Sequence, residues 1–186
     1  VDGLGFEMIG FLDGWRGFHD GDWVVLDRLA VRGISPMGGV MLGTSRVPPF
    51  ESKGGSDAEF DALREQMAEY GLDGLILIGG NGTQTVARLL DSAGIRVVGM
   101  PKTIDNDIPL IGTSFGFQTS YAKAAESIKG ARVEAEAAMG GVGIVKVMGR
   151  SAGFIACYSA LANHDADFVL IPEVPFSLDG EGGLIA

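Results

Sequence analysis

The continuous apolar run at residues 74–78 constrains the fold of this chain more than any other stretch. It contains no charged or polar side chain and opens directly into Gly79-Gly80-Asn81-Gly82-Thr83. A run without alternation is typical of a strand buried on both faces of a parallel sheet. The spacing then predicts a helix over residues 84–92 and a second strand over residues 95–100. This strand–helix–strand order predicts a doubly wound α/β fold, with a mainly parallel sheet and helices on both faces.

The remaining segments continue this alternation. Residues 56–59 (Ser-Asp-Ala-Glu) match a capping box, and apolar residues follow them at helical spacing as far as Gly71. We expect residues 13–17 to form a turn, and the apolar stretch 23–31 is ambiguous between helix and strand. Further strands are predicted at residues 7–12, 40–42, 142–147 and 166–171, and further helices at residues 117–139 and 154–161.

The segment that follows the strand at 95–100 carries the strongest sign of chemistry. It reads Pro101-Lys102-Thr103-Ile104-Asp105-Asn106-Asp107, and because proline has no amide to donate we expect the turn to begin at Pro101. One carboxylate could accept a proton from an attacking hydroxyl while the other helps to hold Mg²⁺ near phosphates. Thr103 could donate to a phosphate or sugar oxygen, and Lys102 could offset developing charge. The alternative interpretation is a solvated acidic turn.

The Gly-rich segment at residues 79–83 lies between a predicted strand and a predicted helix. Backbone N–H groups at such a helix start can approach phosphate oxygens, which predicts a nucleotide or phosphate site. Glycines can also serve only to pack a helix closely on a strand. The segment lacks the Gly-Lys-Ser/Thr of a P-loop and the third glycine of G-x-G-x-x-G, which argues against both of those classes.

Two arginines follow other predicted strand ends. Met148-Gly149-Arg150 ends the strand predicted at 142–147, and Arg46 follows the strand predicted at 40–42. Both suit a phosphorylated ligand, although a single arginine more often forms a surface ion pair.

Composition limits the classes of partner and compartment. The net charge is −10 and there is no run of Lys or Arg, which argues against nucleic acid or an anionic membrane as a partner. Cys157 is the single cysteine, so no disulfide can form within the chain, and we expect a reducing, cytoplasmic setting with Cys157 as apolar filler. No window approaches about 18 uninterrupted apolar residues, so no membrane span is expected.

Taken together, these segments resemble the 6-phosphofructokinase family in order and spacing. The motifs that carry the resemblance are residues 42–46 (LGTSR), 79–83 (GGNGT), 101–107 (PKTIDND), 116–120 (GFQTS), 148–150 (MGR) and 172–176 (PEVPF). The resemblance implies transfer of a phosphoryl group to the 1-hydroxyl of fructose 6-phosphate, giving fructose 1,6-bisphosphate in glycolysis. It also implies a nucleotide lobe over about residues 1–115, the start of a sugar-phosphate lobe over about 116–186, and a homo-oligomer for the full-length protein.

The resemblance also implies a role for each motif. Asp105 would be the base, with Asp107 assisting at the metal or phosphate and Mg²⁺ as the cofactor. The residues implied to contact fructose 6-phosphate are Thr103, Asp105, Met148, Gly149 and Arg150. Those implied to line the nucleotide site are Arg46, Gly80, Asn81, Gly82, Thr83 and Lys102.

The phosphoryl donor depends on two positions. An Asp at position 82 goes with pyrophosphate in this family, because a carboxylate there would crowd and repel the α-phosphate of ATP, and Gly82 leaves room. Lys102 instead favours pyrophosphate as the donor, since many short bacterial ATP-dependent enzymes have Gly at this position. The combination is similar to the plant and trypanosomatid type of ATP-dependent enzyme, so we favour ATP over pyrophosphate.

Three departures from the family pattern qualify these expectations. Asn81 stands where the common pattern has Asp, so we expect a water-mediated or weaker contact of Asn81 with Mg²⁺. Gly141 stands where many bacterial members have an Arg that reaches a neighbouring subunit's substrate. The family's first Gly-rich strand and its later sugar-phosphate residues are missing, so we expect a chain incomplete at both ends. A binding fragment without turnover is therefore one alternative, and a protein similar to NAD kinases, which share a Gly-Gly-x-Gly-Thr turn, is another.

Overall fold

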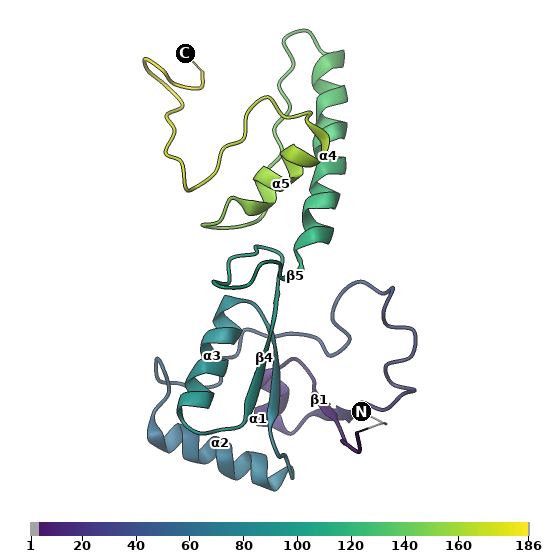
Figure 1. Cartoon of the computed structure of the whole chain (residues 1–186), viewed down its shortest axis with the longest axis vertical. Helices are drawn as coiled ribbons and strands as arrows, with labels where there is room; N and C mark the ends of the chain where they lie inside the picture. The colour runs from purple at the N-terminus through teal and green to yellow at the C-terminus, as the bar shows by residue number, and fades with distance from the viewer. Residues whose placement is uncertain (1–3, 186) are drawn as a thin grey trace. The chain divides into compact units, whose positions relative to one another are not determined.

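The chain folds into two compact units, residues 1–62 and residues 63–186, in a computed structural model that describes residues 4–185. Figure 1 shows the elements in chain order. The division falls inside helix α2 (Asp57–Glu69), so this helix contributes residues to both units. Within residues 4–185, no helix combines the length and hydrophobicity that crossing a bilayer requires.

The first unit is built on a small antiparallel sheet. Strand β1 (Ile9–Phe11) pairs with strand β2 (Trp23–Val25), with Ile9 opposite Val25. Helix α1 (Trp15–Asp20) connects the two strands and buries Phe18. The Phe18 ring packs edge-on against Phe11 and Trp15, with centroid separations of 5.0 Å and 5.4 Å. This aromatic group forms the core beside the hairpin.

The turn predicted at residues 13–17 is confirmed only at Asp13 and Gly14, because helix α1 begins at Trp15. Gly17, which pointed to a turn in the sequence, is needed for close packing instead. A Cβ on Gly17 would lie 2.7 Å from the backbone oxygen of Asp22 and would collide with that of Leu12. A close backbone approach therefore places glycine inside this short helix.

The strand predicted at residues 40–42 does not form. Leu42 lies beside the hairpin, where its carbonyl accepts a hydrogen bond from Asp13 N at 2.7 Å. A Cβ on Gly10 would lie 2.8 Å from the Leu42 side chain. Leu42 thus contributes to packing without joining the ladder of β1 and β2.

The capping box predicted at the start of α2 is confirmed. Ser56 N donates to Glu59 Oε2 at 2.8 Å, and Glu59 N donates to Ser56 Oγ at 3.4 Å. Glu59 also accepts bonds from Ser52, whose hydroxyl is the first cause that lowers the pKa of Glu59 to about 2. Leu63 and Met67 form the buried stripe of the helix.

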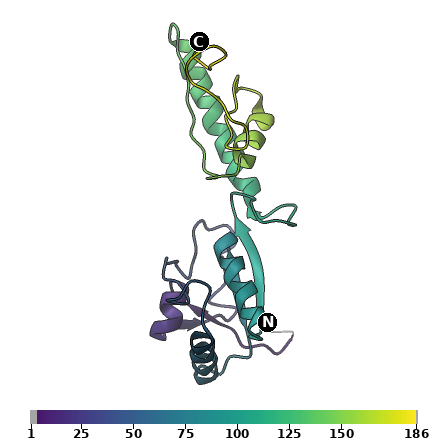
Figure 2. The same cartoon turned by 90° about the vertical axis from the view of Figure 1, so that its left-hand side faces the viewer.

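The second unit contains a parallel three-stranded sheet in the order β3 (Leu75–Gly79), β4 (Val97–Thr103), β5 (Phe115–Gly116). Helix α3 (Asn81–Ser92) connects β3 to β4 and packs on both (Figures 1 and 2). Ala87 and Leu90 are its buried residues. The predicted α/β class with a parallel sheet and flanking helices is confirmed. Burial along β3 alternates, however, and Ile76 and Ile78 are exposed, so this strand is not buried on both faces.

Strand β4 continues past the point where the sequence predicts a turn. Pro101 is still within β4 and pairs with Gly79 of β3, and the strand ends at Thr103. Pairing with β5 begins at the next residue, Lys102, opposite Phe115. Pro101 therefore stands where β4 changes partner, a place where a missing amide removes little from the ladder.

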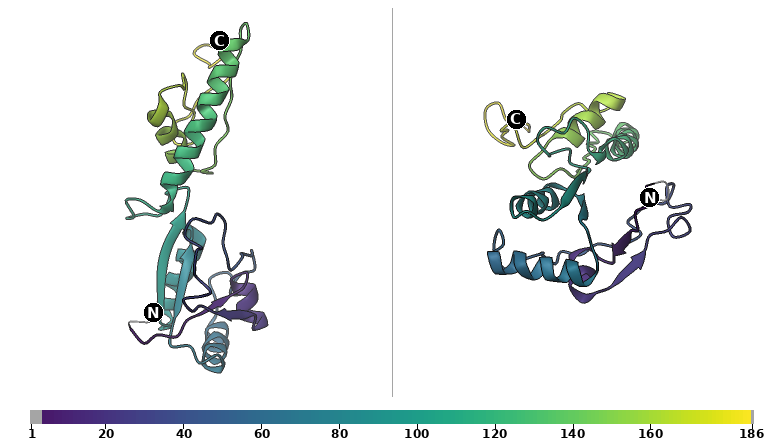
Figure 3. Two further views of the ribbon diagram at one scale, coloured as in Figure 1. Left: turned by 90° about the vertical axis from the view of Figure 1, so that its right-hand side faces the viewer. Right: turned by 60° about the horizontal axis from the view of Figure 1, so that its bottom comes forward.

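The C-terminal part of the second unit is a helix pair, α4 (Phe117–Ala137) and α5 (Phe154–Asn163). The two helices lie side by side in both views of Figure 3, and the rings of Phe117 and Tyr158 are 5.0 Å apart. The strands predicted at 142–147 and 166–171 are wrong: among the described residues these runs pair with no strand. An apolar run can become a strand only where another strand satisfies its backbone groups.

Candidate functional site

The two most informative motifs meet at the carboxyl edge of the parallel sheet. Gly79 pairs with Pro101, so residues 80–83 leave the sheet beside the last two residues of β4, Lys102 and Thr103, from which residues 104–107 continue. A Cβ on Gly80 would lie 3.6 Å from Thr103 Cβ and 3.9 Å from the backbone oxygen of Lys102. The carboxyl edge of parallel strands is where α/β proteins place ligands. The structure thus brings together the Gly-rich segment and the acidic segment.

The side chain of Gln84 joins the ends of β3 and β4. Its Nε2 donates to Gly79 O at 3.0 Å and to Met100 O at 2.9 Å. A Cβ on Gly99 would collide with Gln84 Oε1, so the glycine leaves room for this side chain. Gln84 therefore fixes the spacing of the two strand ends from which the candidate site residues emerge.

The start of α3 presents backbone amides at this edge. Gly80 is the N-cap residue, and no side chain caps the helix. The first N–H groups of a helix have no partner within it, and they carry partial positive charge. Asn81, Gly82 and Thr83 make up this first turn, and a Cβ on Gly82 would meet nothing within 4 Å. The turn can therefore receive an anionic group.

Asp105 and Asp107 are half-buried, and each keeps one oxygen without a partner. Their Oδ1 atoms are both buried and accept no hydrogen bond. Burying an unpaired carboxylate oxygen is unfavourable. Such atoms in a folded protein therefore commonly mark a position where a ligand or cation binds. The pair therefore fits a site that receives a proton and a divalent cation. The solvated acidic turn considered as the alternative does not describe these two residues.

Thr103 is tied to the same turn. Its Oγ1 accepts a hydrogen bond from Asp105 N at 3.1 Å, which leaves the hydroxyl hydrogen available to a ligand oxygen. Lys102 is exposed beside it. Lys102 and Thr103 at the end of β4 and the two carboxylates just after it thus lie on one short segment.

A buried serine and an asparagine close the acidic turn. Ser114 N donates to Asn106 Oδ1 at 2.8 Å, and Ser114 Oγ donates to Thr103 O at 2.6 Å. Asn106 has a left-handed backbone, with φ 55°. These bonds join the two ends of the loop that carries both carboxylates.

The segment Met148-Gly149-Arg150 forms a turn rather than a strand end. Gly149 and Arg150 both have positive φ, 134° and 51°, and Met148 is exposed. Close by, Glu173 Oε1 accepts a bond from Gly153 N at 2.7 Å, just before α5. Among the described residues, no hydrogen bond or ion pair joins residues 148–150 to the acidic turn. Their predicted contact with a sugar phosphate stays a prediction.

Arg46 lies in the first compact unit and is exposed. The hydroxyl of its neighbour Ser45 donates to Asp13 O at 2.7 Å, which fixes the loop from which Arg46 extends. The predicted role of Arg46 at a nucleotide also stays a prediction.

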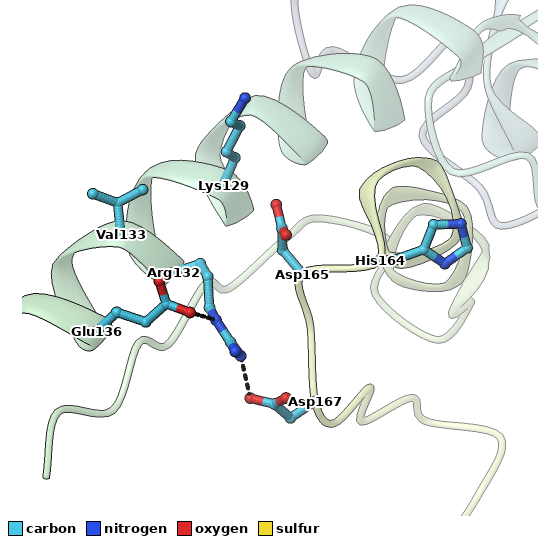
Figure 4. Close-up of a pocket in the computed structure, with 7 residues that line it drawn as sticks. All are labelled: Lys129, Arg132, Val133, Glu136, His164, Asp165 and Asp167. Carbon is cyan, nitrogen blue, oxygen red and sulfur yellow. Dashed lines mark hydrogen bonds and ion pairs between the residues drawn. The ribbon is translucent and has the colours of Figure 1, made fainter.

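A separate polar cavity of about 250 Å³ lies between α4 and the segment after α5 (Figure 4). Arg132 crosses it, bonded to Glu136 Oε1 at 2.6 Å and to Asp167 Oδ2 at 2.8 Å. These bonds, first that to Glu136 and then that to Asp167, raise the pKa of Arg132 above its usual value. The ion pairs satisfy the guanidinium, and none of the sequence-predicted site residues lines this cavity.

Three residues that organise the site have no role in the sequence-based prediction: Gln84, Asn106 and Ser114. Gln84 looks in the sequence like an ordinary start of a helix, and Ser114 like part of a polar loop. Asn106 offered a usable signal, because an Asn between two Asp residues in a turn is among the few side chains that adopt positive φ readily. The contacts of Gln84 and Ser114 depend on tertiary pairing that no local pattern reveals.

Comparison with known proteins agrees with this arrangement. Residues 2–183 match the family model described as Phosphofructokinase. An ATP-dependent 6-phosphofructokinase of Amycolatopsis methanolica is 47% identical over 97% of this chain and 39% of its own length. A pyrophosphate–fructose 6-phosphate 1-phosphotransferase of Streptomyces coelicolor is 44% identical over 96% of this chain and 51% of its own length. An ATP-dependent 6-phosphofructokinase 7 of Arabidopsis thaliana is 42% identical over 96% of this chain.

Solved structures show the same fold. Phosphofructokinase of Pichia pastoris in the T-state superposes with a TM-score of 0.74 at 24% identity, covering 93% of this chain and 20% of that one. The chain spans 39% and 51% of the length of the two bacterial relatives above. The family match covers nearly the whole chain, with the Gly-rich and acidic segments at one sheet edge, and the chain belongs to the phosphofructokinase family.

Proposed function

We propose that the full-length protein transfers the γ-phosphoryl group of ATP to the 1-hydroxyl of fructose 6-phosphate. The observation that carries the proposal is the pair of buried, unpartnered oxygens on Asp105 and Asp107, next to a helix start with free amides. Asp105 is suited to act as a base and Asp107 to bind a cation, while the backbone amides are suited to bind phosphate oxygens. Acceptor and donor would thus meet at one sheet edge.

In this proposal Asp105 accepts the proton of the 1-hydroxyl as its oxygen attacks the γ-phosphorus. The new bond joins that oxygen to phosphorus, the bond from phosphorus to the bridging oxygen breaks, and ADP leaves with the bond's electrons. Thr103, whose hydroxyl hydrogen is free while Oγ1 accepts from Asp105 N, donates to a substrate oxygen. Positioning and electrostatic stabilisation supply most of the rate in phosphoryl transfer.

The charge of the phosphates is met by several groups. The N–H groups at the start of α3, at Asn81, Gly82 and Thr83, face the donor phosphates, and Lys102 is exposed beside them. Asp107 would hold Mg²⁺, with Asn81 in a weaker or water-mediated contact. Mg²⁺ suits such a sparse protein site because it keeps several waters and takes substrate phosphates as ligands. When bound, it would offset negative charge on the transferred group.

The other family motifs complete the proposal. Met148, Gly149 and Arg150 would contact the sugar phosphate, and Arg46 the nucleotide. Residues 1–115 would belong to the nucleotide lobe, and residues 116–186 would begin the sugar-phosphate lobe. The proposal includes a full-length homo-oligomer working in cytoplasmic glycolysis. It includes neither nucleic acid nor an anionic membrane as a partner, which the net charge of −10 supports.

Pyrophosphate is the second candidate donor. The Streptomyces coelicolor relative named for pyrophosphate is almost as similar to this chain as the ATP-dependent one, at 44% against 47% identity. Lys102 is the residue that favours it, whereas the open space at Gly82 favours ATP. The steric argument at Gly82 is the stronger, because a bulky α-phosphate with its nucleoside needs that room.

The test is an assay of the full-length protein with fructose 6-phosphate, Mg²⁺ and either donor. Fructose 1,6-bisphosphate formed faster from ATP supports the proposal, and faster turnover of pyrophosphate establishes the second candidate. No product from either donor contradicts both. The 186 residues alone should be assayed beside the full-length protein, since turnover by this segment would exclude its acting only as a binding fragment.

A further inference from the structure

We infer that Asn106, held by Ser114, is a positioning residue that fixes Asp105 and Asp107 in their working arrangement. The inference rests on the proposed function, because it concerns the geometry of the proposed base and metal-binding carboxylate. It assigns a role to two residues that touch neither phosphate nor sugar in the proposal. Their role lies in the shape of the loop between β4 and β5.

The first observation is the backbone of the acidic turn. Asn106 stands between the two carboxylates with φ 55°, in the left-handed region that most side chains avoid. Strained backbone conformations persist only where the surrounding contacts hold them, and they gather at functional sites. Here the residue with the left-handed backbone is the one that sets the relative directions of its two neighbours.

The second observation is the set of contacts made by the Asn106 side chain. Its Oδ1 accepts from Ser114 N at 2.8 Å and from Ser114 Oγ at 3.2 Å, and its Nδ2 donates to Gly112 O at 3.4 Å. The side chain therefore spans the loop and binds the segment that leads into β5. A residue needed only for its backbone angle would not require these bonds.

The third observation is the place of Ser114. It is only 3% exposed, and its Oγ also donates to Thr103 O at 2.6 Å. One buried serine thus touches the chain on both sides of Asp105, at Thr103 and at Asn106. Thr103 is also paired with Gly116 in the β4–β5 ladder.

These contacts explain how two buried carboxylate oxygens can remain without partners. A flexible loop would turn such oxygens toward water, since a buried unpaired charge is unfavourable. The bonds among Asn106, Ser114 and Thr103 oppose that movement and keep the site ready before any ligand arrives. Preorganisation of this kind affects the chemical step more than binding.

The decisive variant is Asn106→Gly in the full-length protein, because glycine keeps the left-handed backbone and removes the side-chain bonds. We expect kcat with fructose 6-phosphate and ATP to fall by about 10- to 100-fold, while KM for fructose 6-phosphate changes by less than about threefold. Asn163→Ala is the matched control: it removes another asparagine bond to a backbone carbonyl, Nδ2 to Ala125 O at 2.8 Å, far along the chain from the turn. It should lower the melting temperature and leave kcat unchanged.

Ser114→Ala is the second variant and keeps the test informative if Asn106→Gly does not fold. It removes the two hydroxyl bonds but retains the backbone bond to Asn106, so we expect a smaller fall in kcat with the same unchanged KM. The double variant should be no more than about threefold slower than Asn106→Gly alone, as expected for residues acting as one unit.

Two results would overturn the inference while leaving the proposed function intact. One is an active wild-type enzyme whose Asn106→Gly variant has unchanged kcat. The other is a fall in kcat that Asn163→Ala reproduces at equal loss of stability. An inactive wild-type protein would instead contradict the proposed function, so the two failures are distinguishable.

Discussion

Gln84 of α3 donates a hydrogen bond to the backbone carbonyl of Met100 in β4, with 2.9 Å between Nε2 and the oxygen. The same nitrogen donates to Gly79 O of β3, so one side chain holds two neighbouring strands at the edge where the candidate site begins. We therefore expect a substitution of Gln84 to change both the stability of the protein and the geometry of the candidate site.

Replacing Gln84 with Met keeps the length of the side chain and removes both donors. The half-buried carbonyl of Gly79 and the exposed carbonyl of Met100 would each lose this hydrogen bond, so we expect the free energy of unfolding to fall by about 1–3 kcal/mol. Urea titration of wild type and variant measures this change. Gln118→Met provides the control, since Gln118 is exposed at the start of α4. Equal stability of the Gln84 variant and wild type would contradict the assigned role.

Asp105→Asn should abolish most turnover because an amide cannot accept the proton of the attacking hydroxyl. We expect kcat to fall at least about 100-fold, the usual contribution of a positioned base. Steady-state kinetics of the full-length protein with fructose 6-phosphate and ATP test this expectation. Asp73→Asn is the matched control, because Asp73 is exposed and precedes the opposite end of β3. A rate for Asp105→Asn within about threefold of wild type would exclude Asp105 as the base.

Gly82→Asp should shift the donor preference from ATP toward pyrophosphate. A Cβ at position 82 meets nothing within 4 Å and its backbone has no positive φ, so the helix accepts the new side chain without strain. A carboxylate in the first helical turn is also compatible with the helix dipole. Any loss of ATP use therefore reports crowding or repulsion of its α-phosphate rather than misfolding.

The measured quantity for Gly82→Asp is the ratio of kcat/KM for the two donors. We expect it to move at least about tenfold toward pyrophosphate, a modest share of the cost of like charges in contact. Gly82→Asn separates size from charge, since it is almost isosteric with the Asp variant and uncharged. An equal shift in both variants would show that crowding alone decides the donor.

The capping box of α2 predicts a pH-dependent contribution to stability. Hydrogen bonds, first from the Ser52 hydroxyl, lower the pKa of Glu59 from 4.5 to about 2 in the folded protein. A lowered folded pKa means that the contribution is complete above the unfolded pKa and is lost as pH falls between about 4.5 and about 2. Because the carboxylate is exposed, solvent screens these interactions and the effect should be small.

Glu59→Gln tests this prediction. The variant should be less stable than wild type at neutral pH, and the difference should shrink as the pH falls from about 4.5 to about 2. Thermal unfolding at several pH values measures it, with Glu65→Gln on the same helix as a control outside the capping box. A difference that stays constant with pH would show that the Glu59 charge is not involved.

The sequence predicted best those elements whose signals are local. The capping box at Ser56 and Glu59 and the order β3–α3–β4 follow from patterns within a few residues, and all are present. The start of α3 was placed at Gln84, three residues late, because Gly82 looks like loop although it lies in the first helical turn. Glycines misled the helix prediction twice, here and at Gly17 of α1.

Elements that depend on distant partners were predicted less well. The apolar runs at 142–147 and 166–171 have strand composition but no strand beside them in residues 4–185. At Phe115–Gly116 the opposite occurs: two residues without a strand-like sequence pattern form a strand. They pair with β4 because the loop before them returns to the edge of β4. Pairing of this kind depends on the whole fold, and local propensity does not report it.

For the candidate site, the sequence predicted which groups could react, and the structure shows what holds them. Asp105, Asp107 and Thr103 were selected by chemistry and order alone, and their roles stay predictions. Their partners Ser114 and Asn106 were not, because a hydrogen bond across an eight-residue loop leaves no periodic signal.

The succession of β3, α3 and β4 along the chain has a consequence for how the site is assembled. The pairing of Gly79 with Pro101 closes only the segment that contains α3, so less entropy is lost on closure than in bringing residues 148–150 or 172–176 to this edge. Contacts of smaller sequence separation form sooner than more distant ones. We therefore expect the sheet edge that carries residues 80–83 and 102–103 to form early during synthesis and refolding, before the distant motifs. Pulse-labelling hydrogen exchange should find the amides of β3 and β4 protected ahead of those in α5.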